Sequence, residues 1–105
     1  MRFTTARLCG GQAFMAISAD ILDLDMEKAE EFLRKEGCEI VSRDEMMLVY
    51  KWEGKEVTLY TQGKVMYLPQ TVRADCIRDA TALLEKLLEN QKQLTSGSYY
   101  PIDEK

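Results

Sequence analysis

Histidine is absent from this chain of 105 residues, and its absence removes several kinds of chemistry at once. Catalytic triads and Cys-His dyads need an imidazole base, and zinc sites use histidines or paired cysteines as ligands. Cys9, Cys38 and Cys76 are scattered and form no C-x-x-C pair, so they indicate neither a zinc site nor a disulfide framework. We therefore expect no metal, no cofactor and no catalytic residue. The role of Cys9, which a turn at Gly10-Gly11 would expose, stays open.

Long apolar runs are also missing. No segment approaches the roughly 20 apolar residues that cross a bilayer, and the N-terminus lacks the continuous apolar stretch of a secretory signal. A basic surplus is missing too, because 14 Lys and Arg stand against 18 Asp and Glu, for a net charge of −4. Domains that bind duplex nucleic acid through its phosphates usually carry such a surplus. The sequence therefore predicts a cytoplasmic protein without a membrane partner, and it disfavours nucleic acid.

The composition that remains is that of an ordinary globular domain. Hydrophobic residues make up 46% of the chain and charged residues 30%, which is outside the disordered range. A chain of this length supports one hydrophobic core. The apolar rhythm fades after Asn90, and the end of the chain holds Ser-Gly-Ser and Tyr-Tyr-Pro. We therefore expect a single α+β domain over residues 1–92 and a flexible tail over residues 93–105.

Apolar periodicity predicts the order of elements along the chain. A hairpin around Gly10-Gly11 comes first, followed by a helix that is capped by Asp23 or Asp25 and stopped at Gly37. A second helix begins after Thr71 and keeps a 3.6-residue rhythm through residue 88. Strands are predicted over residues 3–8, 13–17, 38–42, 45–52, 57–61 and 64–68, the last three forming a meander. This order predicts an α+β fold in which a curved antiparallel sheet carries two helices packed on one face.

Several local strings accompany this order: Leu24-Asp25-Met26-Glu27-Lys28 at the first helix, Gln62-Gly63-Lys64 between two strands, and Asp75 and Asp79 early in the second helix. Together they resemble one half-repeat of the TATA-box-binding protein fold, over residues 14–88. In that family, the members that bind DNA insert a pair of phenylalanines from the sheet. Tyr60 falls where one of them would lie, but residues 43–46 offer no aromatic residue for the other. The resemblance therefore implies the fold and not the bending of DNA.

The strands carry apolar residues on both sides, which is more than two helices on one side can cover. One alternating set holds Leu48, Tyr50, Trp52, Val57, Leu59, Val65 and Tyr67, and the other holds Met47, Val49, Tyr60, Met66 and Leu68. A second apolar face of this size is unusual on a monomer. Three kinds of cover are open: the N-terminal hairpin or the Tyr99-Tyr100 tail, a second copy in a two-fold homodimer, or a different protein, nucleic acid or small ligand.

The leading hypothesis is a non-catalytic module for self-association or protein interaction, which we expect to form a homodimer. Its interface candidates are Met47, Val49, Tyr60, Met66 and Leu68. The first alternative is a nucleic-acid-binding module with candidates Lys51, Lys55, Tyr60 and Lys64, further stacking platforms at Tyr50, Trp52 and Tyr67, and a phosphate contact at Arg43. The second is a small-ligand domain or an enzyme without histidine, using Asp44 with Glu45 as an acid-base pair or the amine of Lys64.

Overall fold

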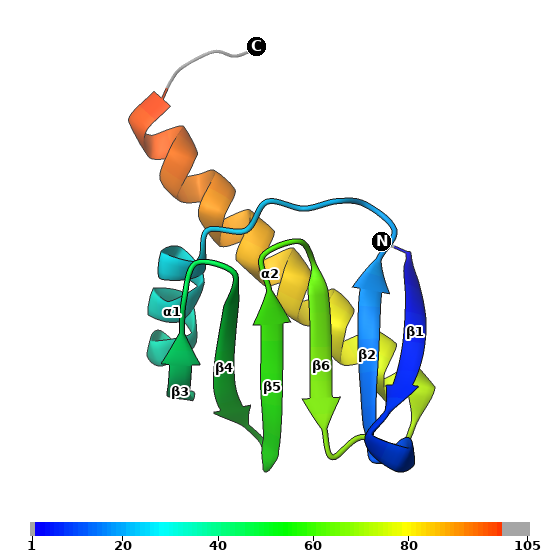
Figure 1. Cartoon of the computed structure of the whole chain (residues 1–105). Helices are drawn as coiled ribbons and strands as arrows, with labels where there is room; N and C mark the ends of the chain where they lie inside the picture. The colour runs from blue at the N-terminus through cyan, green and yellow to red at the C-terminus, as the bar shows by residue number, and fades with distance from the viewer. Residues whose placement is uncertain (1, 100–105) are drawn as a thin grey trace.

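The computed structural model describes residues 2–99, with side chains described through Gln91. Over these residues the chain forms six strands and two α-helices (Figure 1). The strands are β1 (Phe3–Leu8), β2 (Ala13–Ser18), β3 (Glu39–Arg43), β4 (Met47–Trp52), β5 (Lys55–Tyr60) and β6 (Lys64–Leu68). The helices are α1 (Met26–Lys35) and α2 (Arg73–Tyr99), and a short 3-10 turn, η1 (Cys9–Gly11), links β1 to β2. The predicted α+β class is confirmed.

All six strands join one antiparallel sheet in the order β1-β2-β6-β5-β4-β3. Strands β3 to β6 form a continuous meander, and β2 pairs with β6 on its free side. Strand β1 pairs with β2 and forms the edge of the sheet (Figure 1). The N-terminal hairpin therefore widens the sheet and does not fold over its second face, so the first kind of cover considered from the sequence is wrong for the hairpin.

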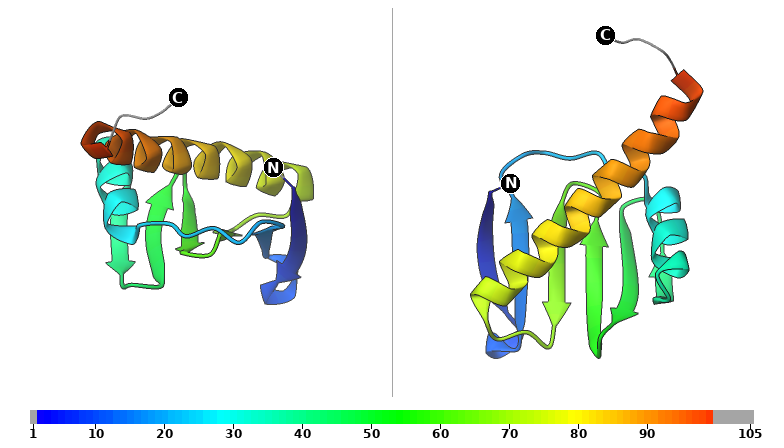
Figure 2. Two further views of the ribbon diagram at one scale, coloured as in Figure 1. Left: turned by 90° about the horizontal axis from the view of Figure 1, so that it is seen from above. Right: turned by 180° about the vertical axis from the view of Figure 1, so that it is seen from behind.

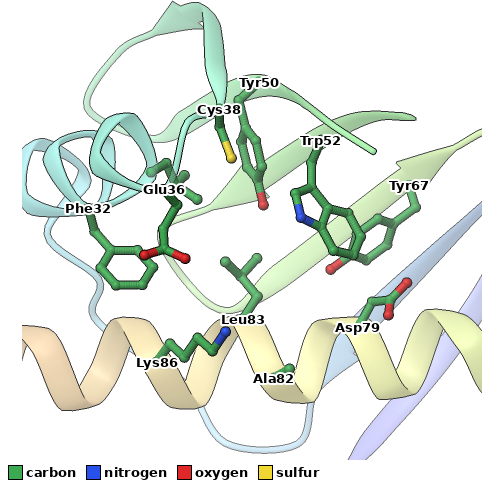
Figure 3. Close-up of a pocket in the computed structure, with 11 residues that line it drawn as sticks. Phe32, Glu36, Cys38, Tyr50, Trp52, Tyr67, Asp79, Ala82, Leu83 and Lys86 are labelled. Carbon is green, nitrogen blue, oxygen red and sulfur yellow. The ribbon is translucent and has the colours of Figure 1, made fainter. Parts of the chain in front are cut away.

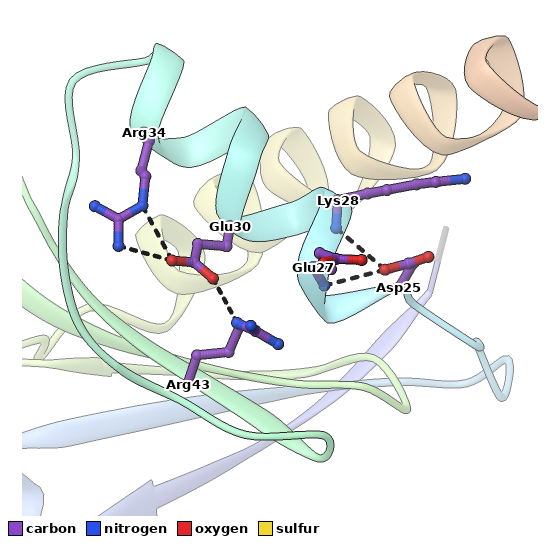
Figure 4. Close-up of polar contacts among 6 residues, drawn as sticks. All are labelled: Asp25, Glu27, Lys28, Glu30, Arg34 and Arg43. Carbon is purple, nitrogen blue, oxygen red and sulfur yellow. Dashed lines mark hydrogen bonds and ion pairs between the residues drawn. The ribbon is translucent and has the colours of Figure 1, made fainter.

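Helix α1 begins at a side-chain cap. The carboxylate of Asp25 accepts hydrogen bonds from the backbone N–H groups of Glu27, at 3.0 Å, and Lys28, at 3.1 Å (Figure 4). These bonds satisfy two of the donors that a helix leaves free at its start. Of the two caps that the sequence predicts, Asp25 is the one used, and Asp23 lies in the preceding loop.

An ion-pair network holds α1 against the edge strand β3. The carboxylate of Glu30 pairs with Arg34 one turn later, at 2.7 Å, and with Arg43 of β3 (Figure 4). The hydrogen bond from Arg34, followed by that from Arg43, lowers the pKa of Glu30 below its ordinary value. The helix ends at Lys35, and Gly37 follows with a φ of 88°, the left-handed conformation typical of the residue after a helix.

Helix α2 crosses the same side of the sheet diagonally, from the β1–β2 edge toward α1 (Figure 2). Its inward positions Cys76, Ala80, Leu84 and Leu87 are buried at helical spacing. The helix continues to Tyr99, past the end predicted near Asn90. Residues 89–94 are mostly good helix formers, which extend a helix without an apolar stripe. The tail predicted over residues 93–105 thus begins inside α2, and its last part, residues 100–105, lies outside the described residues.

The two sides of the sheet differ in what covers them. Figure 2 shows both helices on one side. On that side Tyr50, Val57 and Tyr67 pair across three strands, as do Leu48, Leu59 and Val65, each at most 2% exposed. These residues form the core together with both helices, and Trp52 packs against it. The first alternating set predicted from the sequence is therefore the helix-covered one, and the second set points to the opposite side.

Candidate functional site

The side of the sheet opposite the helices is an open face that no described helix covers. Its central row runs across four strands, because Met15 pairs with Met66, Met66 with Thr58, and Thr58 with Val49. Thr58, at the middle of the row, is 5% exposed, and its apolar neighbours are half-buried. The open face includes Met15, Ile17, Met47, Val49, Thr58, Tyr60, Met66 and Leu68 with the charged residues Glu39, Lys51, Glu56 and Lys64.

The charges on the open face balance. Glu39 pairs with Lys51, and Lys51 with Glu56, so signs alternate along one row across β3, β4 and β5. Lys64 lies near the other end of β6, beside Ile17 of β2. Because two lysines stand against two glutamates, the face has neither the basic surplus that phosphates require nor a charge that would repel a second copy.

All the interface candidates predicted from the sequence lie on this open face. Met47 pairs with Tyr60, Met66 belongs to the central row with Val49, and Leu68 pairs with Glu56. Alternation along the strands was sufficient to find them, since every second residue of a strand faces the same side.

The residues predicted for nucleic-acid binding are divided between the two faces. Lys51, Tyr60 and Lys64 lie on the open face, but Lys55 pairs with Trp52 on the helix-covered side. Its ammonium lies 5.7 Å from the centre of the Trp52 ring. Tyr50 and Tyr67 are buried under the helices, and Trp52 packs there with them. The platform of four aromatic residues therefore does not exist, because three of them belong to the core side.

Arg43, the remaining phosphate candidate, is occupied by its ion pair with Glu30. Asp44, an acid-base candidate, accepts hydrogen bonds from the backbone of Met46 at 2.8 Å and Met47 at 2.9 Å. These two bonds lower the pKa of Asp44 and identify it as the residue that closes the β3–β4 turn. Glu45 beside it is exposed.

The cysteines are all unpaired, with Cys9 exposed in η1 and Cys76 buried on the inner side of α2. Burial raises the pKa of Cys76 to about 11, with Asp79 adding to the effect. Burial also raises the pKa of Cys38. Both thiols are therefore held in their neutral form, which is the unreactive one.

A pocket that the sequence did not predict lies on the helix-covered side, between α1, α2 and the strands β4 and β6 (Figure 3). Its volume is about 110 Å³. Tyr50, Trp52 and Tyr67 form its floor, and the rings of Trp52 and Tyr67 are tilted by 59° with their centres 6.2 Å apart. Asp79 lines it from α2, and the exposed residues Glu36 and Lys86 stand at its mouth.

Asp79 is the charged group of this pocket, and its side chain is 9% exposed. Its Oδ1 accepts a hydrogen bond from Arg78 Nε at 3.2 Å. Its Oδ2 lies 3.7 Å from Lys55 Nζ and receives no hydrogen bond from the described residues. The hydroxyls of Tyr50 and Tyr67, which are 2% and 1% exposed as residues, also make no hydrogen bond within the described part of the chain.

Comparisons with protein-family models, with curated proteins and with solved structures find no significant match to this chain. None of the helices within residues 2–99 combines the length and the apolar character needed to cross a membrane.

Proposed function

We propose that this chain is a non-catalytic self-association module, and that a second copy covers the open face in a two-fold homodimer. The observation that carries the proposal is the position of the covering elements. Both helices lie on one side of the sheet, and the N-terminal hairpin lies at its edge, so the row from Met15 to Val49 has no cover among the described residues. Two sheets that meet at such apolar faces form the common sandwich arrangement.

Charge supports a second copy as the occupant. A two-fold axis brings the same face to both sides of the interface, so a face with a net charge would repel itself. The open face instead alternates Glu39, Lys51 and Glu56 along one row.

The size of the open face sets the expected affinity. Six strands about 4.8 Å apart and about five residues long span roughly 24 by 17 Å, or about 400 Å² of flat area. The relief of the side chains enlarges the accessible area, so two such faces bury on the order of 1,000 Å². That is the lower bound for a specific interface. We therefore expect a dimer of micromolar affinity that dissociates on dilution.

We also propose that the fold is a half-repeat of the TATA-box-binding protein type and that the protein is cytoplasmic. From β2 to α2 the order of elements is strand, helix, four strands and helix, which supports a half-repeat of the TATA-box-binding protein type. A homodimer would provide the two halves that this family joins in one chain. The three unpaired cysteines support a reducing compartment, and we propose the cytoplasm.

Replacing Met66 or Val49 by lysine tests the interface directly. Each change places a charge in the central row, and we expect Met66→Lys and Val49→Lys to weaken the dimer at least tenfold, about 1.4 kcal/mol. Sedimentation velocity over a dilution series measures the dissociation constant. Val72→Lys is the matched control, because Val72 lies outside the sheet and is already 47% exposed.

Unchanged dimerisation in both open-face variants, with folding verified by circular dichroism, would show that copies associate elsewhere. The same measurements would also identify two other occupants of the open face. A monomeric chain that captures oligonucleotides at low salt would favour the nucleic-acid alternative, through Lys51, Tyr60 and Lys64. A monomeric chain without such binding would favour a different protein.

A further inference from the structure

The pocket under α2 is distinct from the open face, because the sheet itself separates the two. Strands β4 and β6 supply Tyr50, Trp52 and Tyr67 to the pocket from one side and Val49 and Met66 to the open face from the other. The fold thus presents a second candidate surface that self-association through the open face does not use.

Three polar atoms of the pocket make no hydrogen bond among the described residues: Asp79 Oδ2 and the hydroxyls of Tyr50 and Tyr67. Asp79 Oδ2 has no hydrogen-bond donor among the described residues and is buried. In Figure 3 the hydroxyls of Tyr50 and Tyr67 point toward the space between the sheet and α2. A buried polar atom without a hydrogen bond destabilises the folded protein. A molecule that enters the pocket therefore gains by supplying a donor to Asp79, and it can also form hydrogen bonds with the two phenols.

The charges around the pocket are already balanced, which argues against an ionic ligand. Arg78 and Lys55 flank the two oxygens of Asp79, at 3.2 Å and 3.7 Å. At the mouth, Glu36 stands across from Lys86. Burial, more than any neighbouring charge, raises the pKa of Tyr50 and Tyr67, so both phenols stay neutral and able to donate.

The lining residues and the volume of the pocket set the size, shape and polarity of the ligand. Phe32 and Leu83 face the aromatic floor across the pocket, so the space is apolar between its polar ends. Its volume of about 110 Å³ is close to the roughly 150 Å³ of an apolar cavity that holds one benzene ring. That is well below the roughly 300–1,000 Å³ of sites for drug-sized molecules. A single flat ring with one small substituent matches this space.

We propose that this pocket binds a small, planar, uncharged molecule that carries an N–H donor beside a hydrogen-bond acceptor, as in an aromatic amide. The N–H group donates to Asp79 Oδ2, the acceptor receives a hydrogen bond from a phenol of Tyr50 or Tyr67, and the ring lies against Trp52. The geometry provides binding and positioning and no reaction step.

Benzamide is the probe, and the chain contains a built-in reporter, because Trp52 is its single tryptophan. We expect benzamide to shift the one indole N–H resonance of the full chain saturably in NMR titrations. Benzoate, which has the same shape but no N–H donor and carries a charge, should bind at least tenfold more weakly. The same benzamide shift in Met66→Lys would show that this site is independent of the dimer interface.

Asp79→Asn should weaken the binding of benzamide at least fivefold, because it removes the carboxylate that accepts the hydrogen bond from the amide N–H. Asp75→Asn is the matched control, since Asp75 bonds to the same Arg78, at 3.2 Å, from outside the pocket. Tyr67→Phe retains the ring without its hydroxyl and should weaken binding severalfold, even if Asp79→Asn folds poorly. The proposal is overturned by an indole resonance that does not saturate with benzamide, by equal binding of benzoate, or by pocket variants that bind as tightly as Asp75→Asn.

Discussion

Tyr50 and Tyr67 flank Val57 on adjacent strands and are almost completely buried. Burial raises the pKa of both phenols above the ordinary value of 10.0, and Cys38 adds to the effect at Tyr50. An unfolded chain releases these protons near pH 10, whereas the folded chain holds them to higher pH. Between the phenol pKa of the unfolded chain and the higher phenol pKa of the folded chain, the folded state binds more protons. Its stability therefore falls as pH rises through this range. The pKa of Cys76 rises from 9.0 to about 11, so this thiol adds the same loss of stability, beginning at a lower pH.

The free energy of unfolding should therefore be level near pH 8 and decline above about pH 9, by up to about 1.4 kcal/mol per pH unit for each group. Urea unfolding at a series of pH values measures this slope. Tyr67→Phe should reduce the decline, because it removes one of the titrating groups. A stability that stays constant up to about pH 11 would contradict the burial of these side chains.

Among the secondary-structure elements, α1 depends on its cap more than on its length. It has ten residues, and isolated helices shorter than about 12–15 residues are marginal in water. Asp25 satisfies two of its first N–H groups, and Met26, Ala29 and Leu33 bury its inner face. The cap and the packing therefore have to supply the stability that a helix of this length lacks on its own.

Asp25→Ala should lower the free energy of unfolding by about 0.5–2 kcal/mol, the usual cost of losing a cap. Chemical denaturation measures the change. Asp23→Ala makes the same substitution two residues earlier and should cost less than about 0.5 kcal/mol, as surface substitutions usually do. Equal losses in the two variants would mean that the carboxylate of Asp25 does not cap the helix.

The sequence was informative wherever a local pattern determined the result. Every second residue of a strand faces one side, so the sequence alone separates Met47 and Tyr60 from Leu48 and Leu59. The pocket was not predictable in this way. Asp79 meets Trp52 because α2 crosses the sheet at an angle, and no local pattern specifies a crossing angle between distant segments.

The end of α2 was missed for a different reason. The prediction follows the apolar rhythm, which stops near Asn90, whereas the helix continues to Tyr99 and begins this extension with good helix formers such as Gln91 and Lys92. The hairpin was found correctly, but its docking was not determined, because a strand with apolar residues can either extend a sheet edge or cover a face. Pairing of β1 with β2 at the edge decides this question and leaves the open face without a cover among the described residues.

Over residues 2–99 the molecule is therefore one-sided: two helices cover one face of a six-stranded sheet, and the opposite face carries an apolar row with balanced charges. Sedimentation equilibrium of the full chain at tens of micromolar tests this account most directly. We expect a mass near twice that of the monomer, falling toward the monomer mass on dilution and already monomeric in Met66→Lys. A strictly monomeric mass at that concentration would contradict the proposal that a second copy covers the open face.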